Sequence, residues 1–243
     1  MKKTILLIGL LAIVTGSALA DVLTLPGFGH GLINTPVAWN STPTHWRASA
    51  FDSFGGSDLA DSGGFSFLYS RNTWEYGGGY VSAADDDNSS MWGLFARLNV
   101  AHTDDGLFAT VLGGYQKFSS DSGDESTQLG SLILGQKFEN FGLNFSGTLW
   151  SNSGEDANGG RIKNDLEVAG NLLIDLDHQK KWTAFVEAYD FTDADKAGRA
   201  LGLIWQWQDN ILLNGAWVGV TNPDNDSRFE LGVTYTFKHK GDE

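Results

Sequence analysis

The sequence contains no cysteine, and only 4 prolines and 16 basic residues occur among its 243 residues. The lack of cysteine excludes a disulfide framework and a lipid anchor on an amino-terminal cysteine. The few Lys and Arg face 30 acidic residues, for a net charge of −14. This balance argues against nucleic acid as a partner, because phosphate binding needs clustered cations. No apolar run after residue 20 is long enough for a membrane-spanning helix.

The segment 1–20, MKKTILLIGLLAIVTGSALA, has the features of a secretory signal peptide. Two lysines precede an apolar run, and Ala18-Leu19-Ala20 follows it. Small residues in this spacing fit signal peptidase, which predicts cleavage after Ala20. A retained membrane anchor is the weaker interpretation, because an apolar run of about ten residues is too short to cross about 30 Å of hydrocarbon as a helix.

The rest of the chain alternates between apolar and polar residues, as β-strands with two different faces do. In 91–101, Trp92, Leu94 and Val100 fall on one face, whereas Arg97 and Asn99 fall on the other. Segments of about nine to twelve residues suit strands that cross a bilayer at a tilt. Twelve are expected, at 44–53, 64–71, 73–82, 91–101, 107–118, 128–138, 141–150, 164–175, 181–191, 198–208, 210–220 and 227–237.

The lengths of the connections separate a membrane barrel from a soluble β-sandwich. Long polar loops are expected near 54–63, 83–90, 119–127, 151–162, 192–196 and 221–226, and they alternate with tight turns. Outer-membrane barrels have short periplasmic turns and longer external loops, whereas Greek-key sandwiches lack this order. We predict an all-β fold, a closed antiparallel up-and-down transmembrane β-barrel of about 12 strands in the outer membrane. It would span 44–237, with a periplasmic tail at 238–243; an exported soluble sandwich is the alternative.

The last expected strand resembles the carboxy-terminal signal by which outer-membrane barrels are recognised by the barrel-assembly machinery. Gly232, Tyr235 and Phe237 occupy the glycine and aromatic positions of that signal. The tail KHKGDE is a departure, because the family usually ends near the last aromatic residue. An ordinary amphipathic strand remains the other interpretation.

Tryptophans also fall near expected strand ends, where indole rings favour the membrane interface. They are Trp46, Trp74, Trp92, Trp150, Trp182 and Trp217.

The segment 21–43 has little strand character and holds three of the four prolines. Pro36 and Pro43 lack the amide donor that a sheet needs, so we expect an irregular segment, either a lumen plug or a periplasmic leader. Within it, 31–38 reads GLINTPVA and resembles the G-x-I-x-T-P-x-A element of YjbH-type barrels, a family tied to exopolysaccharide production. The resemblance implies a link to envelope polysaccharide.

Polar residues on the faces opposite the apolar ones are the candidate lining of a lumen. We expect there Glu75, Arg97, Asn99, Asn144, Asp165, Glu167, Asn171, Glu187, Gln206, Asn214, Arg228 and Glu230. In this set acids outnumber bases, so a water-filled pore would favour cations. An internal hydrogen-bond network that closes the lumen is an equal alternative at this barrel size.

The expected loops are acidic, as at Asp85, Asp86, Asp87, Asp121 and Asp124. Such carboxylates can bind divalent cations that bridge to anionic lipopolysaccharide, although a solvated loop surface is the commoner outcome.

The histidines show neither the His-x-Ser spacing of outer-membrane phospholipase nor a metal cluster, so we expect no catalytic, cofactor or metal residues. The sequence therefore predicts a non-enzymatic, narrow passive channel or accessory pore for small hydrophilic solutes. A structural or surface-binding barrel is the alternative.

Overall fold

The computed structural model describes residues 17–18, 45–54, 62–71, 73–83, 90–121, 123–153, 165–189, 195–219 and 227–237. The predicted signal peptide other than Ser17–Ala18, the irregular segment 21–43, most of the acidic loops and the tail 238–243 lie outside these ranges. The described residues include no helix with the length and apolar character needed to cross a membrane.

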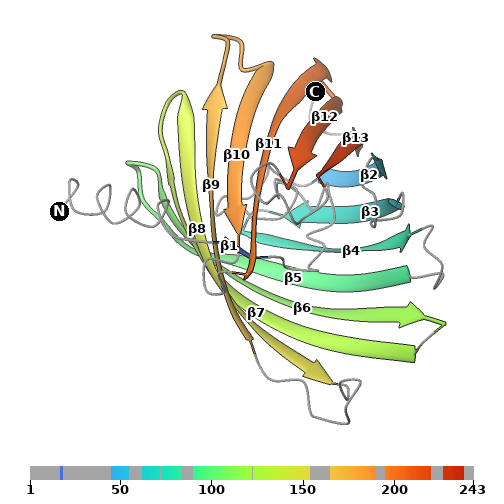
Figure 1. Cartoon of the computed structure of the whole chain (residues 1–243). Helices are drawn as coiled ribbons and strands as arrows, with labels where there is room; N and C mark the ends of the chain where they lie inside the picture. Colours follow the sequence, from blue (N-terminus) through green and yellow to red (C-terminus); the bar gives the residue numbers. More distant parts are fainter. Residues whose placement is uncertain are drawn as a thin grey trace.

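Twelve antiparallel strands form a sheet that closes on itself, seen obliquely in Figure 1. They are β2 (His45–Phe54), β3 (Ser62–Arg71), β4 (Trp74–Ala83), β5 (Ser90–His102), β6 (Leu107–Ser120), β7 (Gly123–Lys137), β8 (Phe141–Ser153), β9 (Asp165–Asp175), β10 (Trp182–Tyr189), β11 (Asp195–Gln208), β12 (Ile211–Val218) and β13 (Arg228–Phe237). Each strand pairs with its neighbours in the chain, and β13 pairs with β2 to close the barrel. The prediction of a closed all-β barrel is confirmed.

A short strand lies outside this ring. β1 (Ser17–Ala18) pairs in parallel with Asp195 and Ala197 of β11. The pairing of β11 with β10 begins at Gly198 and its pairing with β12 begins at Ala200, so this end of β11 extends beyond both neighbours. The contact therefore uses backbone groups that the barrel itself does not pair.

The alternation of side chains gives the barrel an apolar outer face and an interior that is mostly polar, with an apolar cluster that includes Phe185, Ala200 and Val218. On β8, Phe141 and Leu149 are exposed, whereas Asn144, Ser146 and Thr148 are buried. The same alternation runs through the other strands, and large apolar side chains such as Leu94, Leu132 and Leu203 are exposed on the outer face. A continuous apolar outer surface is stable against lipid and not against water, so the barrel spans a membrane.

Aromatic side chains gather toward the ends of the strands on the outer face. Trp46 packs on Tyr69 with ring centroids 4.8 Å apart, and Trp182 stacks on Trp205 at 5.0 Å. Trp217, near the opposite ends of the strands, is also exposed. These positions suit rings that contact acyl chains while their N–H groups reach the headgroup layer.

The two ends of the barrel differ in their connections. We call the short-turn end the one where β3 joins β4, β5 joins β6, β7 joins β8, β9 joins β10 and β11 joins β12; β2 begins and β13 ends there as well. The other end carries the connections between β2 and β3, β4 and β5, β6 and β7, β8 and β9, β10 and β11, and β12 and β13, and we call it the long-loop end. In outer-membrane barrels the short turns face the periplasm.

The sequence predicts a long polar loop at 119–127, and this prediction is wrong. β6 continues to Ser120, β7 begins at Gly123, and these two residues face each other across a tight turn. Lys117 and Asp124 form an ion pair on the outer side of this hairpin, with 2.5 Å between Nζ and Oδ2. β6 and β7 are 14 and 15 residues long, more than a bilayer needs, so their polar tip continues as paired strand beyond the membrane. Figure 1 shows both strands reaching outward.

Candidate functional site

The structure places the residues that the sequence predicts for a lumen on the interior face of the barrel. Those that are buried are Glu75, Arg97, Asn99, Asn144, Glu167, Asn171, Glu187 and Glu230. Gln206, Asn214 and Arg228 are half-buried and follow the same alternation. Asp165 pairs through its backbone with Trp150, and its side chain lies outside the described residues.

Arg47, Glu75 and Arg97 form the first charged group of the interior, which we call the arginine cluster. The strand register sets Glu75 opposite both Ser70 and Arg97. Ser70 Oγ donates to Glu75 Oε1 at 2.7 Å, and Arg97 forms an ion pair with Glu75 Oε2. Arg47 lies within electrostatic range of Glu75 and Arg97. A second guanidinium group therefore lies near this buried ion pair, toward the short-turn end.

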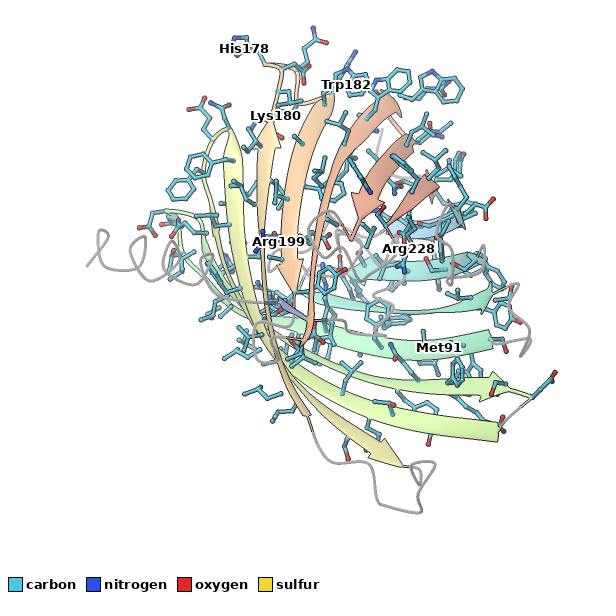
Figure 2. All side chains as sticks on the ribbon, in the orientation of Figure 1. Met91, His178, Lys180, Trp182, Arg199 and Arg228 are labelled. Carbon is cyan, nitrogen blue, oxygen red and sulfur yellow. The ribbon has the colours of Figure 1, made fainter. Side chains whose placement is uncertain are left out.

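Glu167, Glu187 and Glu230 form the second charged group, which we call the acidic wall. They come from β9, β10 and β13, near the long-loop end. Tyr189 lies within electrostatic range of all three and of Arg228. Among the described side chains, Arg228 donates from Nε to Glu230 Oε1 at 2.9 Å. Figure 2 shows Arg228 well away from Lys180 and Trp182, which mark the short-turn end.

Uncharged polar side chains of the interior pair between neighbouring strands. Asn144 donates to Asn171 at 2.8 Å, and Asn99 donates to Thr110 at 3.1 Å. In both pairs the residues stand directly opposite each other in the strand register. These bonds therefore run along the wall of the barrel and do not join opposite walls.

Sequence reasoning missed two members of these groups. Arg47 lies in HWRASAF, where Trp46 and Ala48 alternate with it, and the same period-two reading that found Arg97 would have found it. Tyr189 shares its face of β10 with Glu187, yet its aromatic ring suggests the outer face when it is considered alone. Tyr189 comes two residues after the buried Glu187, and alternate residues of a strand share a face, which predicts that its side chain also points into the barrel.

The residues of the expected assembly signal lie on both faces of β13. Tyr235 and Phe237 are exposed on the outer face near the short-turn end, with ring centroids 4.9 Å apart. Gly232 is on the opposite face, where a Cβ would come within 2.5 Å of Asn214 Oδ1. The close packing of β12 against β13 therefore gives this glycine a structural role as well.

Comparison with known proteins gives likeness in structure only. No family model matches the sequence, and no curated protein matches it. The solved structure of the KdgM porin in complex with disordered oligogalacturonate is similar at a TM-score of 0.60 and 12% identity, covering 79% of this chain and 99% of that chain. The NanC porin follows at 0.59 and 12%, covering 78% and 100%.

The outer membrane protein Omp33 of Acinetobacter baumannii is similar at a TM-score of 0.52 and 7% identity, covering 80% of this chain and 98% of that chain. At these identities the likeness is one of fold. Together with the apolar outer face and the closed ring of strands, it identifies this chain as an outer-membrane β-barrel with a porin-like fold.

Proposed function

We propose that this barrel is a narrow passive channel for small hydrophilic solutes. The observation that carries the proposal is the pairing of interior polar groups along the wall, as in Asn144 with Asn171 and Asn99 with Thr110. A polar wall can replace part of the hydration of a solute, which lowers the barrier to passage. The fold shared with the KdgM and NanC porins supports the same proposal.

We further propose that the channel prefers cations. The reason is where the acidic side chains lie in the interior, more than their overall number. Arg47 adds a third arginine to the interior and narrows the overall excess of acids. Among the described side chains, acids gather in the acidic wall, where Glu167, Glu187 and Glu230 lie within electrostatic range of Tyr189, as does Arg228. A cation that enters from the long-loop end would meet this region first.

Planar-bilayer recording with refolded protein tests the proposal. We expect single-channel steps, and under a gradient of potassium chloride a reversal potential of the sign that cation selectivity gives. Swelling of liposomes in sugars of increasing size would measure the width of the passage. A protein that is fully folded, as judged by heat-modifiable gel mobility, and silent at all voltages would contradict the channel.

A non-conducting structural or surface-binding barrel is the second candidate, and the burial of interior charge favours it. Glu75, Glu187 and Asn144 are fully buried at 0% exposure, as expected for a filled interior. In this version the acidic loops, most of which lie outside the described residues, bind divalent cations and lipopolysaccharide. If a chelator changed neither cell-surface binding nor the melting temperature, the ion-bridging role would be abandoned.

Two further parts of the proposal concern partners. Recognition by the barrel-assembly machinery would use Gly232, in the middle of β13, and Tyr235 and Phe237, near its carboxy-terminal end. The link to envelope polysaccharide stays a prediction, because the segment 31–38 that carries it lies outside the described residues. Deletion of the gene, followed by measurement of surface polysaccharide, would test that link.

A further inference from the structure

Arg199 places a guanidinium group on the outer face of the barrel. Its neighbours in β11, Gly198 and Ala200, are buried on the interior face, whereas Arg199 is exposed. Because alternate residues of a strand share a face, its side chain points toward the membrane. Figure 2 shows Arg199 well away from Lys180 and Trp182, which mark the short-turn end. Arg199 therefore lies on the outer surface toward the long-loop end.

The residues that flank Arg199 on this face are small and uncharged. Ala188 of β10 stands directly opposite it, and on the other side the backbone N–H of Gly219 donates to its carbonyl oxygen at 2.9 Å. No acidic side chain of the described ranges forms an ion pair with Arg199. A guanidinium group on a lipid-facing surface is unfavourable unless it reaches the headgroup layer, where it can bind an anion.

An aromatic stack on the same face marks the membrane interface near Arg199. Trp217 stacks on Phe229 with ring centroids 5.7 Å apart, and Phe229 stacks on Phe54 at 6.3 Å. We call these three exposed rings the outer aromatic stack. Trp217 stands opposite Leu201, and Arg199 comes two residues nearer to the long-loop end, about 7 Å along the strand. Arg199 therefore lies beside Trp217 and closer than Leu201 to the headgroup layer.

We propose that Arg199 and the outer aromatic stack form a binding site for lipopolysaccharide, with the guanidinium group on one of its phosphates. The long-loop end faces away from the periplasm in barrels of this kind, toward the leaflet that contains lipopolysaccharide. A guanidinium group binds phosphate through two parallel N–H donors, and a phosphate supplies the negative charge that no described residue offers to Arg199. The flat rings of Trp217 and Phe229 offer apolar surface to the acyl chains. Such a site would exist whether or not the lumen conducts.

Lys117 shows what a neighbouring carboxylate does to a cation at the same end of the barrel. It stands directly opposite Trp92 on the outer face, so it also combines a cation with an exposed indole ring. Its Nζ lies 2.5 Å from Asp124 Oδ2, so its charge is already paired. Arg199 has no such partner among the described residues. We therefore expect the phosphate at β11 and not at β6.

Isothermal titration calorimetry with purified lipid A, added in detergent micelles to the refolded protein, tests the site. A chelator is present throughout, so that divalent bridges to the acidic loops cannot contribute. Arg199→Gln should weaken binding about tenfold, because a bidentate charged hydrogen bond is lost. Arg71→Gln is the matched control, because Arg71 is also exposed on the outer face but ends β3 at the short-turn end, and it should leave binding unchanged. Lipid A without its phosphates should bind the wild-type protein as weakly as intact lipid A binds Arg199→Gln.

The controls separate a phosphate site from less specific contacts. Equal affinity of wild-type and Arg199→Gln protein for lipid A would overturn the site, because the guanidinium group would then not bind phosphate. An equal loss in Arg71→Gln would overturn it as well, because charge alone would then attract the lipid. Binding that appears only when calcium is restored, and that Arg199→Gln leaves unchanged, would assign lipopolysaccharide to the acidic loops instead. Heat-modifiable gel mobility confirms that each variant is folded, so a loss of affinity cannot come from unfolded protein.

Discussion

The arginine cluster makes a quantitative prediction about stability. Glu75 is 0% exposed, and Arg97 and Arg47 are 3% and 6% exposed. The substitution Glu75→Gln keeps the shape of the side chain and removes the carboxylate with which Arg97 forms its ion pair. Two guanidinium groups would then remain in a poorly hydrated interior, and we expect a loss of about 3 to 5 kcal/mol in the free energy of unfolding. That is a large fraction of the about 5 to 15 kcal/mol typical of a folded protein.

Unfolding in guanidinium chloride, followed by tryptophan fluorescence in lipid vesicles, would measure this loss. Asp124→Asn is the control, because its pair with Lys117 is exposed and screened by water, and it should cause no measurable change. The double variant Glu75→Gln with Arg97→Met should recover part of the stability, because it also removes one of the two buried guanidinium charges. If Glu75→Gln cost no more than Asp124→Asn, the argument from buried charge would be refuted.

Two further predictions concern β13 and the glycines. Phe237→Ser should lower the amount of barrel assembled in the outer membrane, as measured by immunoblot of the membrane fraction. Leu231→Ser also removes an outward apolar side chain of β13 and should have a much smaller effect. Equal assembly of wild-type and Phe237→Ser protein would contradict an assembly signal. Gly198→Val should destabilise the barrel in the same unfolding assay, because the ring of Tyr189 occupies the place of the added Cβ. At Gly130 an added Cβ would meet nothing within 4 Å, so Gly130→Ala should be neutral or stabilising by about 0.5 to 1 kcal/mol.

The strands and their faces could be predicted because a membrane barrel imposes one repeating pattern. Arg97 and Asn99 on one side of β5, and Trp92 and Leu94 on the other, follow from alternation alone. The closed ring is predicted because an even number of such strands brings the first and the last strand together with both chain ends on the same side of the membrane. No pairing partner needs to be identified, because each strand pairs with its neighbour in the chain.

Other features depended on contacts that the sequence does not display. The hairpin from Lys117 to Asp124 is rich in serine and acidic residues, and composition alone cannot distinguish a loop from paired strands in water. The place of Tyr189 over Gly198 depends on the register of β10 against β11. The charge balance of the interior changed once Arg47 was seen beside Glu75.

The projecting hairpin of β6 and β7 has a consequence for what the cell presents to its surroundings. Its tip at Ser120 and Gly123 lies on the long-loop end, which faces away from the periplasm in barrels of this kind. Each paired residue beyond the headgroups raises the tip by about 3.4 Å along the strand. Because its backbone is hydrogen-bonded up to the turn, the hairpin offers a fixed shape to an antibody or a phage, and its sequence can diverge without disturbing the lumen below.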